Sequence, residues 1–359
     1  MAFLRNTWYV AANAYELDLG MVARTICNKN IVMFRTSTGT IAALEDRCPH
    51  RFVPLSMGKR VGDTVQCAYH GLRFDATGKC IEAPNDDDKQ KERICVTSYP
   101  AVERYAVIWL WMGEAERADP KTIPDFSFLS NKEKFGSCQG YSYIKGNYQL
   151  IADNLLDLSH VHYLHPTIHE GSEFSNFTNK VRREGDTVWS MLWRHHYHLD
   201  KKRQAMYGFA SDDVEGQGHS RWDAPGVLLV ETALWDHGKS IAEGGIETPS
   251  AHLLTPETEF TTHYFWGSGR TFEIHNQAMS AGTAQIMKTT FETQDGPMVE
   301  AQQRQMGATS DFLEQRPMVL RADSAGLMAR RVMQRKIRGE MSGEDSVAHE
   351  SEDLQVAGE

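Results

Sequence analysis

Two mixed Cys/His pairs mark the stretch CPHRFVPLSMGKRVGDTVQCAYH, residues 48–70. Cys48 and His50 form the first pair, and Cys67 and His70 form the second. Two thiolates and two imidazoles can hold a 2Fe-2S cluster, with both cysteines on one iron and both histidines on the other. Structural zinc is the alternative, although zinc motifs usually keep two cysteines in one pair and two histidines in the other. The mixed pairs therefore predict an iron-sulfur cluster.

The residues around this stretch are typical of a small all-β domain. β-rich runs at 31–34 and 41–44 are separated by the turn Ser37-Thr38-Gly39-Thr40, which indicates a hairpin. The run Val107-Ile108-Trp109-Leu110-Trp111 is apolar on both faces, as expected for a buried strand. No helical pattern of ordinary length interrupts these runs. We therefore expect residues 1–113 to form one all-β domain.

The chain beyond residue 113 changes character. A polar stretch with Pro120 and Pro124 is the expected linker. Helical and strand-like patterns then alternate, with helix expected at 148–165, strands at 187–193 and 263–266, and helix again from about 277 to 338. The predicted fold class is α+β. It comprises the all-β domain at 1–113, a domain at 114–338 in which helices gather on a sheet, and a tail at 339–359.

Composition limits the classes of protein to which the chain can belong. The 359 residues are 41% hydrophobic and 24% charged, as in globular proteins, and no apolar run reaches the ~18 residues of a membrane span. Seven acidic residues, and no Lys or Arg, lie at positions 340–359, so this tail is expected to be disordered. The rest carries only about −3 of the net charge of −10, which argues against a nucleic-acid partner. We expect a cytoplasmic protein without a membrane partner.

A second group of metal-ligating residues lies in the segment DNLLDLSHVHYLHP, residues 153–166. Asn154, Asp157 and His160 are three residues apart, so a helix would place them on one face, whereas a solvated surface helix is the alternative. The proline after His165 disfavours the α conformation, so the helix should end there and let that ring turn back. Two histidines and one carboxylate form the facial triad of Fe(II) oxygenases. His162 points elsewhere, and we expect no metal role for it.

The third iron ligand must come from another part of the chain. Spacing alone leaves Glu292, Asp295 and Glu300 as candidates. Asp295 precedes Gly296-Pro297, an interruption of the helical pattern at which a short carboxylate can leave the line of the helix. The residues by themselves keep all three positions open.

Together the two motifs resemble those of the Rieske non-haem iron aromatic-ring oxygenases, in particular the branch of vanillate O-demethylase and dicamba monooxygenase oxygenase components. The resemblance covers nearly the whole chain, and the metal motifs are highly specific to this superfamily. The shared segments are Arg5-Asn6-Thr7-Trp8-Tyr9-Val10-Ala11, Cys48-Pro49-His50-Arg51, Tyr69-His70-Gly71-Leu72, residues 153–158, Leu254-Thr255-Pro256-Glu257-Thr258, Tyr264-Phe265-Trp266-Gly267 and Asp323-Ser324-Ala325-Gly326.

The resemblance implies a Rieske domain followed by a helix-grip catalytic domain, with helices on an antiparallel sheet, assembled as a homotrimer. It selects Asp295 as the third iron ligand beside His160 and His165. It also implies that Asp157 joins a cluster histidine of one subunit to an iron histidine of the next, where a carboxylate would orient both rings. We take Asp157 and Asn154 as the candidate catalytic residues.

Residues that contact the substrate are harder to identify. By the resemblance, His252 falls at a substrate-contacting histidine. Val230 and Ile286 stand near positions where the dicamba enzyme has an asparagine and a tryptophan, so dicamba itself is not the expected substrate. The residues Arg194, His196 and His198 alternate along a strand-like run and would share one face. They are candidates to bind a carboxylate, and a solvated strand face is the alternative.

We interpret the chain as a terminal oxygenase that O-demethylates a methoxylated aromatic acid similar to vanillate. Electrons from NAD(P)H would reach one 2Fe-2S cluster and then one Fe(II) per subunit through a flavin- or ferredoxin-type reductase. O2 would hydroxylate the methyl carbon, and the product would collapse to a phenol and formaldehyde. Cis-dihydroxylation or methyl hydroxylation of an aromatic acid are alternatives on the same metal sites. An electron carrier would not need the domain beyond residue 113, and metal analysis would distinguish a zinc-bound binding module.

Overall fold

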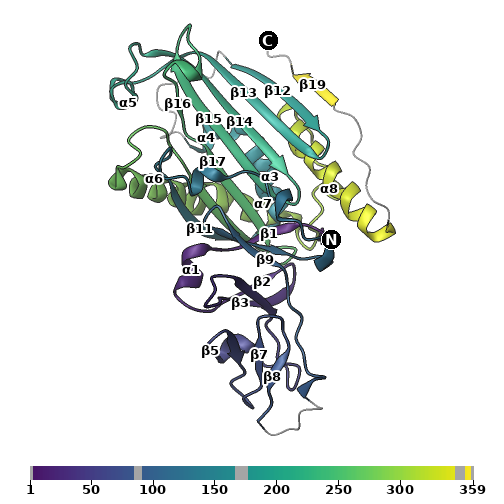
Figure 1. Cartoon of the computed structure of the whole chain (residues 1–359). Helices are drawn as coiled ribbons and strands as arrows, with labels where there is room; N and C mark the ends of the chain where they lie inside the picture. Colours follow the sequence, from purple (N-terminus) through teal and green to yellow (C-terminus); the bar gives the residue numbers. More distant parts are fainter. Residues whose placement is uncertain (1–2, 85–90, 166–176, 344–351, 357–359) are drawn as a thin grey trace. The chain divides into compact units, whose positions relative to one another are not determined.

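The structure is a computed structural model that describes residues 3–84, 91–165, 177–343 and 352–356. It contains two compact units, drawn in Figure 1. The N-terminal unit comprises Arg5–Ile123 together with Thr255–Thr258. The C-terminal unit comprises the described residues before Arg5, Pro124–Leu254 and the chain from Glu259 onward.

The sequence suggested a division after residue 113. In the structure the two units divide after Ile123. The segment expected to be a linker stays bonded to the N-terminal unit. Trp111 Nε1 donates to the carbonyl of Glu114 at 2.8 Å, and Trp8 Nε1 donates to the carbonyl of Asp119 at 3.0 Å. A largely buried indole N–H needs an acceptor, and these carbonyls supply it. The chain therefore leaves the unit about ten residues later than its polar composition indicated.

The N-terminal unit is all-β, as predicted. Among its described residues, three antiparallel sheets are formed, joined by one-turn helices. In pairing order, the strands are β1 (Trp8–Asn13), β10 (Val107–Trp111) and β9 (Ala101–Arg104); β2 (Val22–Ile26), β3 (Lys29–Arg35) and β4 (Ile41–Glu45); and β5 (Lys59–Val61), β6 (Thr64–Gln66), β7 (Arg73–Asp75) and β8 (Cys80–Glu82). The short helices are α1 (Ala14–Asp18), η1 (Leu55–Met57), η2 (Ala115–Arg117) and η3 (Pro120–Thr122).

Strand pairing confirms two expectations for this unit. β3 and β4 form the predicted hairpin, and the Thr36 N–H closes its turn by donating to the Thr40 carbonyl at 2.8 Å. All five residues of β10 are buried, since β10 is the central strand of its sheet. Ile108 and Leu110 on one face enter an apolar core with Tyr9, and Trp109 on the other face is also fully buried, which explains why the strand is apolar throughout.

The C-terminal unit is built on one large antiparallel sheet, which has nine strands among the described residues (Figure 1). In pairing order, they are β11 (Cys138–Ile144), β18 (Thr262–Ser268), β17 (Ser250–Pro256), β15 (Val227–Asp236), β14 (Asp213–Asp223), β13 (Thr187–His198), β12 (Phe177–Glu184) and β19 (Glu352–Val356), with β16 (Ile246–Glu247) beside β15. This sheet with its helices confirms the α+β class.

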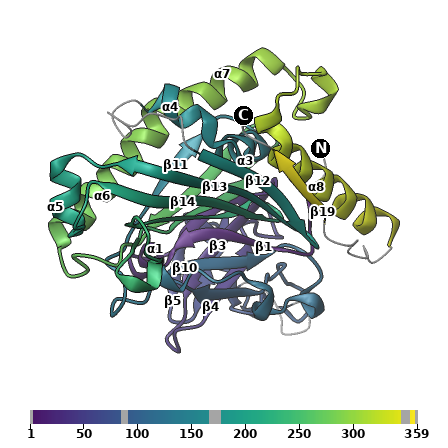
Figure 2. The ribbon, with the colours of Figure 1, turned by 90° about the horizontal axis from the view of Figure 1, so that it is seen from above.

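Helices cover the sheet in Figure 2, where α6, α7 and α8 lie along one side of β13 and β14. They are α3 (Tyr148–Leu156), η5 (Leu158–His160), α4 (Val161–Leu164), α6 (Gln277–Thr290), the π-helical turn η7 (Phe291–Asp295), α7 (Gly296–Met306) and α8 (Ser324–Ser342), with shorter α5 (Lys201–Tyr207), η4 (Ser127–Leu129), η6 (Ile241–Glu243), η8 (Leu313–Gln315) and η9 (Arg321–Asp323). None of the described helices is long and apolar enough to cross a membrane.

α3 is held between the sheet and α8. Its N-terminus is capped by Asn147, whose side chain accepts from the Gln149 N–H. Ser220 on β14 donates to the carbonyl of Leu155 at 3.0 Å, and most α3 side chains are buried in the main core of the unit. The end of α3 therefore has a defined position over β14, which matters because the predicted iron ligands follow it.

The C-terminal tail departs from the prediction of disorder from residue 339. α8 continues to Ser342, and Gly343 ends it with φ +70°. Residues 352–356 form β19, which pairs with β12, whereas residues 344–351 and 357–359 lie outside the described residues. β12 would otherwise be an edge strand with unpaired backbone groups. Backbone pairing thus orders part of a segment whose acidic composition indicated none.

Candidate metal centres

The two predicted cluster motifs form matching loops in the N-terminal unit. In each loop the cysteine N–H donates to the carbonyl of the residue five positions later. The carbonyl of the same cysteine accepts from the N–H of the residue four positions later. These bonds are Cys48 N to Val53 O (2.9 Å), Phe52 N to Cys48 O (2.9 Å), Cys67 N to Leu72 O (2.8 Å) and Gly71 N to Cys67 O (3.2 Å). The residue four after each cysteine has positive φ, +64° at Phe52 and +75° at Gly71, so both chains turn back sharply.

The four predicted cluster ligands lie together on these loops. The side chains of Cys48 and Cys67 are buried, and their thiols are in hydrogen-bonding contact. Burial, together with the adjacent Cys67, raises the pKa of the Cys48 thiol, so two thiolates here need a cation between them. The rings of His50 and His70 lie nearer the surface, with centroids 4.4 Å apart. Two inner sulfurs and two outer imidazoles fit a 2Fe-2S cluster.

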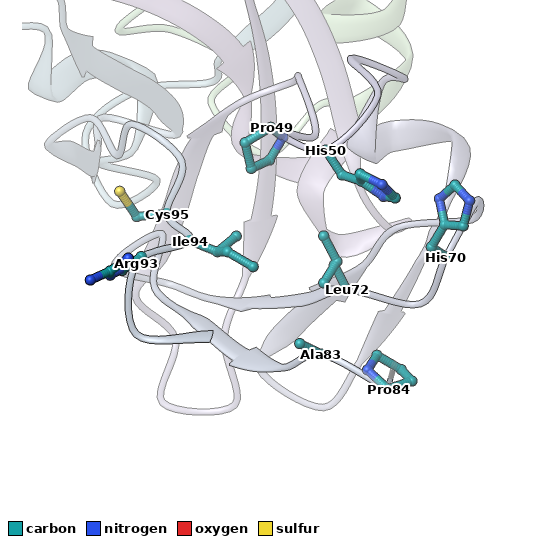
Figure 3. A pocket seen from close by; sticks show the side chains of 9 residues that line it. All are labelled: Pro49, His50, His70, Leu72, Ala83, Pro84, Arg93, Ile94 and Cys95. Atoms are coloured by element: carbon teal, nitrogen blue, oxygen red, sulfur yellow. The ribbon is translucent and has the colours of Figure 1, made fainter. Parts of the chain in front are cut away.

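A pocket of about 480 Å³ opens beside the two histidines (Figure 3). It is lined by Pro49, His50, His70, Leu72, Ala83, Pro84, Arg93, Ile94 and Cys95. Figure 3 shows the two imidazoles toward one end and Arg93 and Cys95 toward the other. The histidine side of the cluster site therefore borders open space.

The predicted iron ligands come together in the C-terminal unit. Asp295 Oδ1 lies 3.2 Å from His165 Nε2 and 3.5 Å from His160 Nε2. The two rings are nearly perpendicular, at 82°, with centroids 5.2 Å apart. His165 and Asp295 are each 5% exposed, whereas the His160 side chain is 21% exposed. Two imidazoles and one carboxylate converge on one point, and this donor set suits Fe(II) with coordination positions left open.

A hydrogen bond at Nδ1 orients each of the two imidazole rings. His160 Nδ1 donates to the carbonyl of Asp157 at 2.5 Å, and His165 Nδ1 donates to Gln294 Oε1 at 2.6 Å. Both partners are acceptors, so each Nδ1 carries the proton and each Nε2 keeps its lone pair for a metal. Sequence reasoning did not assign a role to Gln294. Its only signal was its position before Asp295.

Asp295 reaches the histidines through an irregular turn of its helix. It ends the π-helical turn η7, between α6 and α7. The predicted interruption at Gly296-Pro297 is this π turn and not the end of the helix, because Gly296 keeps helical angles (φ −54°, ψ −52°). Pro297 has no N–H for the regular i to i−4 bond, and a wider turn removes the conflict. The extra residue moves the Asp295 carboxylate out of the α-helical line.

The other two carboxylate candidates have different partners. Glu292 Oε1 accepts from the Ser142 hydroxyl at 3.4 Å, and Glu300 Oε1 accepts from the Lys145 N–H at 3.0 Å. Among the described residues that could ligate a metal, Asp295 is grouped with both histidines and neither glutamate is.

The expected continuous helix through Asn154, Asp157 and His160 does not form. α3 ends one residue before Asp157, which is extended (φ −102°, ψ 91°) and caps η5 by accepting from the Ser159 N–H at 2.9 Å. Aspartate is a strong N-cap residue, so it starts a new turn here. His160 is therefore positioned by η5. Asn154 Nδ2 still lies 3.4 Å from Asp295 Oδ1, beside the iron ligands.

His252 is buried on β17 and bonded at both ring nitrogens. Nδ1 pairs with the Tyr264 hydroxyl at 2.6 Å, and Nε2 pairs with the Ser250 hydroxyl at 2.9 Å. The edge-on ring of Phe291 lies 5.6 Å away. Burial lowers the pKa of His252 to about 4, although the Asp295 carboxylate opposes the shift. The imidazole is therefore neutral near neutral pH.

Arg194 and His196 do not share one strand face, contrary to the predicted alternation. The pairing of β13 with β14 shifts between Arg194 and Tyr197, and His196 has φ +51°. An extra residue in one strand of a pair breaks the period of two. The His196 side chain is 52% exposed and bonds to Asp213 at 3.1 Å. Arg194 is the member of this group that stays partly buried.

Comparison with known proteins identifies both units. Residues 7–100 match the Rieske 2Fe-2S domain, and residues 144–339 match the vanillate O-demethylase oxygenase C-terminal domain. The chloroacetanilide N-alkylformylase oxygenase component of Rhizorhabdus wittichii is 34% identical over 94% of this chain and 97% of that one. The vanillate O-demethylase oxygenase subunit of a Pseudomonas species is 32% identical over 96% and 98%. The crystal structure of dicamba monooxygenase with non-heme iron and dicamba has a TM-score of 0.81 at 31% identity, over 96% of this chain and all of that one.

Proposed function

We propose that this chain, which belongs to the Rieske non-haem iron oxygenases with the vanillate O-demethylase oxygenase C-terminal domain, removes the methyl group of a methoxylated aromatic acid. The products would be a phenol and formaldehyde. Each turnover would consume one O2 and two electrons, which NAD(P)H supplies through a separate reductase. The second oxygen atom would leave as water.

The residues of the two sites support this chemistry. When bound, the cluster supplies electrons and the Fe(II) activates O2. His160, His165 and Asp295 would hold the iron and leave coordination positions open for O2, and the methyl group would have to lie beside the iron without binding to it. The hydroxylated methyl carbon would then lose formaldehyde as the phenol oxygen takes up a proton. Holding the methyl carbon at this point requires contacts on the rest of the substrate.

The position of Arg194 in the sheet supports an acidic substrate. Arg194 lies on the face of β13 that carries Leu192, whose partner on β14 is Gly218. A Cβ atom built on Gly218 would point at Leu158, 3.8 Å away, in the turn that leads to His160. Arg194 therefore belongs to the side of the sheet that faces the iron-ligand segment.

Within the part of the chain that the structure describes, the guanidinium of Arg194 has no acid to pair with. The described residues offer it no carboxylate and no hydrogen-bond acceptor, and the ring of Tyr197 lies 5.6 Å away. Burial lowers the pKa of Arg194, which reflects the cost of keeping this charge out of water. A guanidinium matches a carboxylate with two parallel hydrogen bonds. The carboxylate of an aromatic acid would supply a partner for Arg194. A neutral anilide would not.

We propose further that the active enzyme is a homotrimer in which Asp157 connects subunits. Asp157 Oδ1 accepts from Ser159, and its other carboxylate oxygen has no partner among the described residues. Its carbonyl orients His160, as described above. His50 and His70 border open space in the N-terminal unit, so a cluster histidine of another copy can donate to the vacant oxygen. A flavin- or ferredoxin-type reductase would be the electron donor.

The experiment is turnover of candidate methoxylated aromatic acids with a surrogate reductase, with phenol, formaldehyde and NAD(P)H measured together. We expect equal amounts of phenol and formaldehyde. Arg194→Gln should lower kcat/KM for the acid by about 10- to 150-fold, as expected for a charge-assisted hydrogen bond of ~1.5–3 kcal/mol. Activity on the neutral methyl ester should change little. Arg182→Gln, which removes an exposed arginine paired with Glu184, is the matched control.

Two outcomes would contradict the proposal in different ways. An equal loss on acid and ester would remove Arg194 as the acid anchor and leave demethylation standing. A dihydrodiol, or a hydroxylated methyl product without formaldehyde, would assign the site to dihydroxylation or methyl hydroxylation. The Rhizorhabdus wittichii relative favours a second candidate, N-dealkylation, which would release an amine or anilide instead of a phenol.

A further inference from the structure

A second group of potential metal ligands lies in the C-terminal unit apart from the iron triad. His196, Glu215 and His237 each have one ligand atom within 4.8 Å of the other two. His237 Nδ1 lies 2.7 Å from Glu215 Oε1, and His195 Nδ1 lies 2.9 Å from Glu215 Oε2. The rings of His196 and His237 have centroids 4.4 Å apart. Imidazoles thus surround a single carboxylate.

Three neighbouring strands hold this group in place. Glu215 lies on β14, opposite the bulge of β13 that carries His195 and His196. His237 directly follows the last residue of β15. The Glu215 side chain is 15% exposed, whereas those of His196 and His237 are about half exposed, at 52% and 51%. The carboxylate is therefore fixed on the sheet, and the imidazoles close over it from the solvent side.

The backbone of His196 has a positive φ angle, which helps to place its ring beside Glu215. Its φ of +51° is uncommon for any residue with a side chain, although histidine tolerates it better than most. A regular strand would send successive side chains to opposite faces. The bulge instead places His195 and His196 around the same carboxylate. Asp213 holds the His196 ring through Nδ1 at 3.1 Å.

We propose that His196, Glu215 and His237 bind a divalent transition-metal ion of the zinc type, with Asp213 orienting His196. Imidazole and carboxylate ligands suit Zn²⁺, Ni²⁺ and Cu²⁺. Ligands ~2.0–2.2 Å from a tetrahedral zinc lie about 3.4 Å from one another, so atoms within 4.8 Å need only small ring rotations. Because both rings are half exposed, the fourth position is open to water. The ion would tie together the ends of β13, β14 and β15.

The test is a zinc titration of the iron-loaded holoenzyme, followed by calorimetry and by metal analysis. Asp213 raises the pKa of His196, so the titration is run at least one pH unit above the ordinary histidine value of ~6.5. We expect one zinc per chain without loss of iron, and a higher Tm. His237→Ala should abolish this binding, and Asp213→Asn should weaken it by about 10- to 100-fold.

His198→Ala is the matched control, because His198 is 66% exposed at the end of the same strand and lies outside the group. It should bind zinc like the wild type. His237→Gln repeats the test with a smaller change in side-chain volume, and retention of the mononuclear iron, which lies in the same unit, reports folding of each variant. Equal zinc affinity in the wild type and both His237 variants would overturn the proposal. So would zinc uptake that releases iron mole for mole, or no uptake at all.

Discussion

Replacement of Asp153 by alanine would remove the charged contact that fixes α3, the helix that leads to the iron ligands. Arg330 on α8 is 3% exposed and donates to both carboxylate oxygens of Asp153, from Nε at 2.9 and 3.1 Å and from Nη2 at 2.6 Å. Its other bond within α3, from Nη1 to Gln149 Oε1, is 3.3 Å long. Alanine would therefore leave a buried guanidinium with one long hydrogen bond.

The expected loss follows from the burial of the two partners. Removal of one member of a buried ion pair costs about 3–5 kcal/mol in the free energy of unfolding. The Asp153 side chain is 26% exposed, so water can enter the vacated position and we expect the lower end, ~3 kcal/mol. For a unit of this size, each kcal/mol lowers Tm by ~2–4 °C, which predicts a fall of about 6–12 °C. Iron content should fall as well, because α3 also carries Asn154.

The assay is thermal unfolding followed by circular dichroism, with iron measured in the same samples. Asp186→Ala is the control, because Asp186 is also an ion-paired aspartate, but its partners Arg335 and Lys336 are each 27% exposed, whereas the Arg330 side chain is 3% exposed. An ion pair at that exposure contributes at most about 1 kcal/mol. Equal losses in the two variants, or a loss in Asp153→Ala below ~1 kcal/mol, would refute the argument that the buried pair holds α3.

Three further predictions concern the metal sites and their surroundings. Asp295→Ala should lose the mononuclear iron and keep the visible spectrum of the cluster, whereas Glu292→Ala should keep both; iron retained in the first and lost in the second would show that the wrong carboxylate was chosen. Asp157→Asn should keep both metals, but stopped-flow with substrate and O2 should show very slow reoxidation of the cluster, and a normal rate would exclude the bridging role. The pKa of His252, about 4 in the fold against ~6.5 in the unfolded chain, means that protonation favours unfolding. Its contribution is complete above pH ~6.5 and is lost as pH falls toward 4, by ~3 kcal/mol in total. Urea unfolding of His252→Gln should show a flatter pH dependence over that window.

The cluster site shows what local sequence determines. Its ligands lie within two short loops, and a ligand pair two or three residues apart can be recognised whatever the rest of the chain does. The same holds for the β3–β4 hairpin and for β10, whose apolar residues on both faces already required burial on both sides. Each of these patterns is contained in a short stretch of sequence, so it is visible in one dimension whichever distant segments it later contacts.

Local sequence indicated the two histidine ligands of the iron site but not the rest of the site. His160 and His165 could be proposed from five residues of spacing, but the helix face used to argue for them does not exist, because Asp157 caps a new turn. The choice of Asp295 depends on a π turn that neither hydrophobic period nor propensity reveals. Its neighbour Gln294, which orients His165, had no signal other than its position before Asp295.

The sequence by itself determined the two metal motifs, the all-β and α+β character of the two regions, and the residue types at each site. Tertiary structure decided which distant carboxylate meets the histidines, which strand positions share a face after the β13 bulge, and where the units divide. It also decided that Arg194 meets no carboxylate among the described residues and that β12 pairs with part of the acidic tail. The reason is physical. Strand register, the β13 bulge and the meeting of Asp295 with His165 depend on contacts with other segments of the chain, and those contacts leave no periodic trace in the segments themselves.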